Sequence, residues 1–227
     1  VLDLSLDDIG PDESIREENL VIDIAGSGVG IANIAIKNDN FIFLENSGGA
    51  LTTLNLTGSG DLGIQGTLAN SITTINGTNS SANLTITSGT GDDTITGGSG
   101  NDSIILNGGT NNVDSGNGSD TITLSAGNDT VNTGAGYDVV VAEAGSNTIS
   151  TGTQNDTLTI NGGTNLVFAG ADGDTIHVHD GTNTVDGETG NDTLFISGGN
   201  NAINGGSGDD KITPVSYTHI RAHETRG

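Results

Sequence analysis

Branched aliphatic residues recur at a fixed interval of nine in the second half of the chain. An Asp or Asn stands two positions before each of them, in fourteen copies without an insertion or deletion. These positions are Asp93, Asp102, Asn111, Asp120, Asp129, Asp138, Asn147, Asp156, Asn165, Asp174, Asn183, Asp192, Asn201 and Asp210. A fixed period with one constant apolar position is typical of stacked structural units, and it argues against fourteen separate sites.

A longer period of eighteen lies within the period of nine. In every second copy a further apolar residue follows the aliphatic one by two positions, as in Ile104 and Leu106. In the alternate copies that position is mostly small, as in Val113 and Ser115. Because residues two apart share one face of a strand, both members of each pair are expected to point inward. The pattern predicts an all-β fold, a parallel β-solenoid whose 18-residue coil consists of strand, turn, strand and turn.

The Asx residues of the two kinds of copy differ as well. Copies with two inward apolar residues carry Asp at 102, 120, 138, 156, 174, 192 and 210, and we call these the Asp row. The alternate copies carry Asn except at Asp93 and Asp129, and we call these the Asn row. Glycine-rich turns such as GGSGND at 97–102 precede the Asp row, whereas NGGTN precedes the Asn row at 107–111.

Composition and charge narrow the choice of partner. The 227 residues include 38 Gly, no Cys and only 3% aromatic residues, and the formal net charge is −24. Such a charge disfavours nucleic acid and anionic membrane surfaces and favours a cation. Without cysteine, a metal site must use ligands other than thiolate, most simply oxygen. No run of eighteen apolar residues occurs, so the sequence predicts no membrane span.

The Asp row is the candidate cation site. Stacked coils would place its carboxylates about 4.8 Å apart. Charges at that distance repel by about 1 kcal/mol in water and by about 3 to 4 kcal/mol at an effective dielectric near 20. A hard divalent cation would neutralise them, and Ca²⁺ prefers oxygen ligands. We therefore expect Ca²⁺ in the Asp row, with folding coupled to binding. In the Asn row we expect most Asx residues to act as turn formers instead.

Two stretches, GGSGNDSII at 97–105 and GGSGDDKIT at 205–213, resemble the nonapeptide of RTX, or haemolysin-type calcium-binding, repeats. The resemblance covers residues 88–213 and implies a parallel β-roll of fourteen nonapeptides, in which an aspartate of each turn binds Ca²⁺. The ligands it implies are Asp102, Asp120, Asp138, Asp156, Asp174, Asp192 and Asp210, with Asp93 and Asp129 as secondary candidates. The Asn row departs from the family pattern in its Asn and in the apolar residue that replaces the first glycine.

Residues 1–87 contain β-type segments without the nine-residue period. Their spacing of roughly ten to twelve residues predicts a less regular β-solenoid or a sandwich-like region. Ser14 and Glu17 form a capping-box pattern, which predicts a short helix within 11–19. The stretches at 51–64 and 71–96 are similar to segments that lead into such repeats in bacterial S-layer and adhesin proteins.

Other patterns point to little further chemistry. Gly26, Gly28 and Gly30 follow an apolar strand but lack the G-x-G-x-x-G spacing of a dinucleotide loop. His177 and His179 form an isolated pair, which is typical of a solvent-facing surface more often than of a zinc site. The chain has no G-x-S-x-G, no H-E-x-x-H and no cysteine nucleophile, so we expect no enzymatic activity.

The ends of the chain carry separate expectations. Residues 214–227 hold two of the five Lys and Arg residues and no repeat, so we expect a tail that is not native to the protein. The chain begins at Val1 and shows no signal peptide, and we expect it to be a piece of a longer protein.

The RTX resemblance implies a function outside the cell. It implies a calcium-binding structural module of a secreted bacterial surface protein, an S-layer protein or large adhesin exported by type I secretion. Other surface-layer protomers or cell-surface polysaccharide would then be partners besides calcium. The alternative is the C-terminal repeat domain of a secreted toxin, protease or lipase. Ice or glycan binding by outward threonines is a third hypothesis, although the outward residues are too mixed for a regular ice-matching array.

Overall fold

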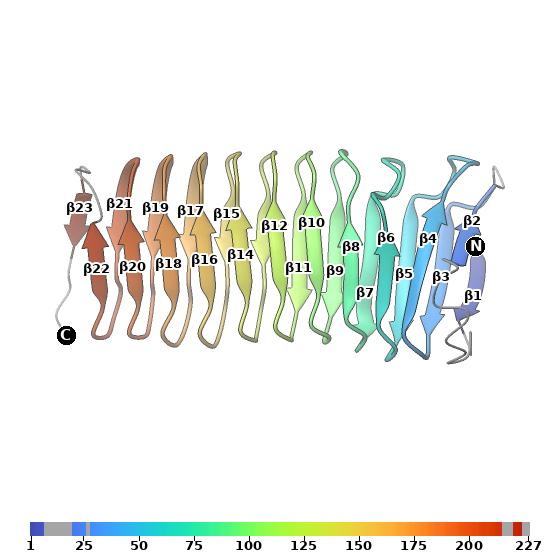
Figure 1. Cartoon of the computed structure of the whole chain (residues 1–227), viewed down its shortest axis with the longest axis horizontal. Helices are drawn as coiled ribbons and strands as arrows, with labels where there is room; N and C mark the ends of the chain where they lie inside the picture. The colour runs from blue at the N-terminus through green and yellow to red at the C-terminus, as the bar shows by residue number, and fades with distance from the viewer. Residues whose placement is uncertain (7–19, 26–27, 215–219, 224–227) are drawn as a thin grey trace.

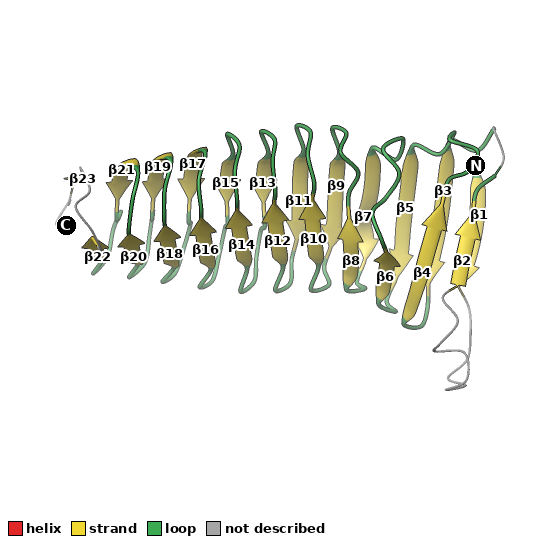
Figure 2. Ribbon diagram, turned by 45° about the horizontal axis from the view of Figure 1, so that its top comes forward, coloured by secondary structure: helices red, strands yellow, loops and turns green. Residues whose placement is uncertain are grey.

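The computed structural model describes residues 1–6, 20–25, 28–214 and 220–223. In these residues the chain forms strands and no helix, and the strands wind into one elongated solenoid (Figure 1). Odd-numbered strands form one twelve-stranded sheet and even-numbered strands form a second sheet of eleven. Successive strands therefore alternate between two facing sheets, and the turns gather along the two long edges of the rod (Figure 2). The predicted all-β parallel solenoid is confirmed.

The strands have the following bounds. The odd-numbered sheet consists of β1 (Leu2–Leu6), β3 (Ile31–Ile36), β5 (Thr53–Gly58), β7 (Thr74–Ser80), β9 (Thr94–Gly98), β11 (Asn112–Gly116), β13 (Thr130–Asn132), β15 (Thr148–Ser150), β17 (Thr164–Phe168), β19 (Thr182–Asp186), β21 (Asn200–Asn204) and β23 (Ile220–His223). The even-numbered sheet consists of β2 (Leu20–Asp23), β4 (Asn40–Glu45), β6 (Leu62–Gln65), β8 (Leu84–Thr87), β10 (Ser103–Leu106), β12 (Thr121–Leu124), β14 (Val139–Ala142), β16 (Thr157–Ile160), β18 (Thr175–Val178), β20 (Thr193–Ile196) and β22 (Lys211–Pro214).

Strand register in the repeats follows the 18-residue period. Each strand pairs in parallel with the strand one coil further along, so that Ile104 lies opposite Ile122 and Val113 opposite Val131. Paired strands lie about 4.8 Å apart, and equivalent residues of successive coils consequently stack in files along the rod. The register confirms that one coil consists of two nonapeptides.

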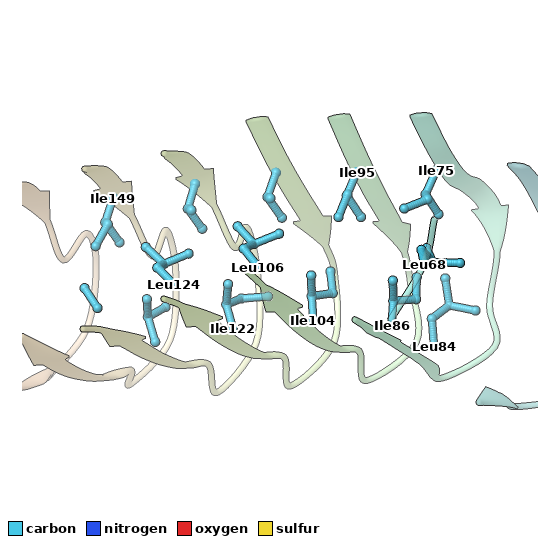
Figure 3. Packing of buried hydrophobic residues seen from close by; sticks show 14 of the residues in the cluster. Leu68, Ile75, Leu84, Ile86, Ile95, Ile104, Leu106, Ile122, Leu124 and Ile149 are labelled. Carbon is cyan, nitrogen blue, oxygen red and sulfur yellow. The ribbon is translucent and has the colours of Figure 1, made fainter. Parts of the chain in front are cut away.

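The core is a set of stacked aliphatic side chains between the two sheets. From β10 to β20 each even strand contributes two buried aliphatic positions, such as Ile104 and Leu106, and from β9 to β21 each odd strand contributes one, such as Val113. In Figure 3 the labelled isoleucines and leucines of the strands point from both sheets into this narrow interior, and Leu68 joins them from the segment between β6 and β7. The small residue predicted to face inward from the odd strands is also buried, as Ser115 shows.

Residues upstream of the repeats continue the same solenoid with longer coils. Ile31 pairs with Thr53 and Asn40 with Leu62, an offset of 22 residues, while Thr53 pairs with Thr74. The sandwich alternative for residues 1–87 is therefore wrong, and the irregular solenoid is correct. The longer coils bury more aliphatic residues, and the coil from 53 to 73 buries Leu54, Leu56, Leu62, Ile64, Leu68 and Ile72.

Several predictions concern the ends of the rod. The short helix expected within 11–19 lies outside the described residues. In the terminal segment 214–227, strand β23 pairs in parallel with β21, while 215–219 and 224–227 lie outside the described residues. The non-native origin of this tail stays a prediction. Within the described part of the chain, no helix has the length and hydropathy needed to cross a membrane.

Candidate metal centre

The Asp row and the Asn row run along opposite edges of the rod. Each residue of the Asp row ends the turn that leads from an odd strand to the next even strand, as Asp120 does between β11 and β12 (lower edge in Figure 1). The Asn row lies where the turn from an even strand enters the next odd strand. Four of its members, Asp93, Asn111, Asp129 and Asn147, directly precede the odd strand, whereas Asn165, Asn183 and Asn201 are its second residue. The side chains of both rows are buried, Asp120 being 1% exposed. Only Asp210, in the last coil of the repeat, is partly exposed.

One oxygen of each Asp row carboxylate is fixed by the backbone of the preceding coil. The N–H of Asp102 donates to Oδ1 of Asp120 at 2.7 Å, and the N–H of Asp120 donates to Oδ1 of Asp138 at 2.8 Å. The same bond recurs along the row up to Asp210, and the N–H of Leu84 donates to Asp102 at its start. These bonds orient every carboxylate in the same way.

The second oxygen of these carboxylates has no hydrogen-bond partner among the described residues. This holds for the buried Oδ2 atoms of Asp102, Asp120, Asp138, Asp156, Asp174 and Asp192. The neighbouring hydroxyls of Ser115, Thr133 and Thr151 do not satisfy them, because each donates its one proton to a carbonyl of the next coil. Buried polar atoms are nearly always paired, because an unpaired one loses its hydration without compensation. A file of six such oxygens therefore suits an electropositive ligand.

Backbone carbonyls in the same turns are also unpaired. The carbonyl of the residue two positions before the Asp, such as Gly118 before Asp120, accepts no hydrogen bond from the described residues. It points along the rod, since a Cβ added to Gly136 of the next coil would collide with it. Gly136 has a φ of 151°, in a region that L side chains rarely adopt. Each turn of the Asp row thus presents a carboxylate oxygen and a carbonyl oxygen.

These carboxylate and carbonyl oxygens suit a hard cation as ligands. Among the described residues, no three His, Asp or Glu side chains converge on one point. An ion at this edge would therefore need backbone carbonyls as well as the Oδ2 atoms, and mixed carboxylate and carbonyl oxygens are the ligands that Ca²⁺ takes.

Comparison with known protein families identifies the repeat. The family model of the RTX calcium-binding nonapeptide repeat matches four consecutive segments, residues 87–122, 123–158, 159–194 and 195–213. The chain belongs to this RTX family. Repeats of this family typically bind Ca²⁺ and indicate a secreted protein. No curated protein and no solved structure gave a match. The expected resemblance is confirmed for the repeats, while no match supports an S-layer or adhesin relationship for the upstream coils.

Burial changes the acidity of the RTX aspartates. Desolvation raises the pKa of Asp102, Asp156 and Asp174 from 3.8 to about 7, and neighbouring carboxylates raise it further. Desolvation likewise raises the pKa of Asp120 and Asp192 to about 6. Part of these carboxyl groups is therefore protonated in the metal-free roll near neutral pH, and a bound cation would favour the ionised form.

The small inward position of the odd strands makes room for the carboxylates. A Cβ added to Gly97 or Gly187 would collide with Oδ2 of the Asp five residues later, Asp102 or Asp192. The residues at this position are Gly97, Ser115, Thr133, Thr151, Ala169, Gly187 and Gly205. Sequence reasoning placed them inside the coil but did not connect them with the candidate site, although their five-residue spacing from the Asp row is constant.

The two aspartates of the Asn row stand apart from each other. Asp93 and Asp129 are buried at 1% exposure and are separated by Asn111. Both carboxylate oxygens of Asp93 and the Oδ2 atom of Asp129 are unpaired among the described residues. Desolvation raises the pKa of both. Asp93 and Asp129 are therefore isolated candidate ligands and do not form a continuous row of carboxylates.

The remaining sequence patterns lie away from both rows. The His177 ring stacks on Phe195 with 4.8 Å between ring centroids, and His179 Nδ1 lies 3.1 Å from the Ser197 hydroxyl. Neither histidine belongs to a three-residue ligand group among the described residues. Gly28 and Gly30 precede strand β3, where a dinucleotide loop would require a helix, and Gly26 lies outside the described residues.

Proposed function

We propose that Ca²⁺ binds along the Asp row of this RTX module and that its binding completes the folding of the β-roll. The file of buried, unpaired Oδ2 atoms carries the proposal. Removing a charge from water without a partner costs several kcal/mol, and adjacent carboxylates in the file repel one another. A divalent cation offsets both terms.

The ligands would come from successive turns of one edge. The ions would be held by the Oδ2 atoms of Asp102, Asp120, Asp138, Asp156, Asp174, Asp192 and Asp210. The carbonyl oxygen two residues before each Asp would be a further ligand. The cation supplies charge neutralisation. The protein holds each carboxylate in place through the N–H to Oδ1 bond from the preceding coil.

We infer further that the parent protein is a secreted bacterial surface protein, an S-layer protein or a large adhesin. Calcium outside cells is about millimolar, the range in which extracellular calcium modules bind. A calcium-dependent roll would stay unfolded in the cytosol and fold after export. The elongated rod suits a structural role (Figure 1). The buried carboxylates form one row of like groups, an arrangement that does not resemble the acid and base pair of a catalytic site.

The genomic context tests the assignment of the parent protein. A protease or lipase motif encoded upstream of this chain would contradict the surface-protein hypothesis. It would favour the C-terminal repeat domain of a secreted enzyme instead.

Calcium titration followed by circular dichroism tests the binding proposal. We expect β-sheet signal to rise with calcium, and we expect Asp138→Asn and Asp156→Asn to raise the calcium midpoint several-fold. Asp114→Asn is the matched control, because it removes the same charge from the exposed face of β11 and should move the midpoint less than about two-fold. A full solenoid signal in excess chelator at neutral pH would refute the proposal.

A further inference from the structure

The asparagines on the other edge satisfy their own hydrogen bonds. Nδ2 of Asn147 donates to the carbonyl of Ala144 at 3.0 Å and to Oδ1 of Asn165 at 2.9 Å. One donor therefore closes the turn that contains Asn147, and the other joins it to the next coil.

The same pair of contacts recurs along this edge. Nδ2 of Asn165 donates to the Gly162 carbonyl at 2.9 Å and to Oδ1 of Asn183 at 2.8 Å. Nδ2 of Asn183 donates to the Asp180 carbonyl at 3.0 Å and to Oδ1 of Asn201 at 2.9 Å. Every amide N–H of these two side chains thus has an acceptor, and the file from Asn147 to Asn201 contains no carboxylate.

The carbonyls of these turns are satisfied too. The Gly145 carbonyl accepts from the N–H of Thr164, and the Gly163 carbonyl accepts from the N–H of Thr182. By contrast, the turns of the Asp row leave one carbonyl and one carboxylate oxygen unpaired in each coil. The two edges therefore differ in whether oxygen atoms remain for a cation.

We propose that the Nδ2 groups of the asparagines take the place of a cation on this edge, so that the roll binds calcium along the Asp row and not between residues 147 and 201. An NH₂ group with two donors links a carbonyl of its own turn to a side-chain oxygen of the next coil. Calcium would link the same kinds of oxygen, but at the cost of dehydrating the ion. This inference rests on the proposed calcium binding by the Asp row.

Asp129 is the informative exception within the Asn row. It has no Nδ2, and the carbonyl of Ala126, which such a group would reach, accepts no hydrogen bond from the described residues. Its Oδ2 atom is unpaired as well. Replacing the amide by a carboxylate thus leaves the same kind of oxygen pair that the Asp row shows, which supports the equivalence of amide and cation.

The calcium stoichiometry of the full chain tests the inference. The seven aspartates of the Asp row leave six intervals, and the Asn row would add six more if both edges bound calcium. We expect equilibrium dialysis at neutral pH to give about six ions, or up to eight with Asp93 and Asp129. About twelve ions would overturn the inference while leaving the proposed function intact. A chain that binds no calcium would refute both.

Single substitutions on the two edges give an independent test. We expect Asn165→Ala to leave the number of bound ions unchanged, whereas Asp156→Asn should lower it by at least one. We also expect Asn165→Asp to add at least one ion, because it converts the amide into an unpaired carboxylate. Loss of ions from Asn165→Ala equal to that from Asp156→Asn would contradict the inference. If Asn165→Ala does not fold, the wild-type stoichiometry and Asn165→Asp still decide it.

Discussion

Protonation should partly replace calcium in stabilising the folded roll, because protons and calcium would bind to the same carboxylates. The perturbation is acidification of the metal-free chain. The folded-state pKa is about 7 for Asp102, Asp156 and Asp174 and about 6 for Asp120 and Asp192, against 3.8 for an ordinary Asp. A raised folded-state pKa means that the folded chain binds more protons than the unfolded chain between about pH 4 and 7. Stability is thus gained as the pH falls through this window and is lost as the pH rises through it.

The size of the effect follows from these shifts. Raising a pKa from 3.8 to about 7 corresponds to about 4 kcal/mol per group as an upper limit, and raising it to about 6 corresponds to about 3 kcal/mol. Neighbouring carboxylates are coupled, because a proton bound to one lowers the pKa of the next, so we take about 1 kcal/mol per group. Five such groups give about 5 kcal/mol, which is comparable with the whole stability of an ordinary domain. Protonation could therefore decide whether the metal-free roll folds.

The assay is far-ultraviolet circular dichroism of the metal-free chain from pH 8 to pH 5. The range stops at pH 5 because the isoelectric point is about 4.1 and the chain loses its charge there. We expect the β-sheet signal to rise on acidification with a midpoint between about pH 6 and 7, and to stay constant in saturating calcium above pH 6. A metal-free signal that does not change, or that falls on acidification, would show that the carboxylates do not limit folding.

Two further predictions concern the space around the site and the upstream coils. Gly187→Ala places a Cβ against the Gly205 carbonyl and the carboxylate of Asp192, contacts that the coil with Ala169 avoids, and should raise the calcium midpoint several-fold. Gly108→Ala on the opposite edge meets no atom nearer than 3.8 Å and should not raise it. Equal midpoints in calcium-titrated circular dichroism would show that Asp192 adapts to a Cβ as Asp174 does. Residues 31–75 bury aliphatic side chains but no Asp, so in chelator at neutral pH their amides should stay protected from hydrogen exchange while those of 94–210 exchange. Uniform exchange would exclude a calcium-independent upstream part, and uniform protection would contradict the calcium-coupled folding of the repeats.

The repeat itself was predictable because its pattern is local. Ile104 with Leu106 and Val113 with Ser115 already show which residues face inward, and strand alternation converts that pattern into an 18-residue coil. The upstream register was not predictable, because the 22-residue offset between Ile31 and Thr53 depends on turns without a repeated sequence signal.

The chemistry of the two edges was predictable only in part. Like charges in register pointed to the Asp row as the cation site, and the structure adds which oxygen atom is unpaired. The reason for a small residue at this position was not visible, because its closeness to the carboxylate five residues later, as between Gly187 and Asp192, arises only when the turn forms. The two donors of Asn147 likewise find their acceptors in the turn and in the next coil, and composition does not specify such a pairing.

The strand order of the solenoid has a mechanical consequence. Each strand is hydrogen-bonded only to the strands one coil before and one coil after it, so no bond in the sheets holds distant coils together. Tension applied to the ends of the repeat would therefore peel the rod from a terminus, one coil at a time. Each detached coil of eighteen residues would release about 60 Å of extended chain. Bound calcium would raise the force needed for each step, so the rod would lengthen in increments under load and rewind when the load is removed.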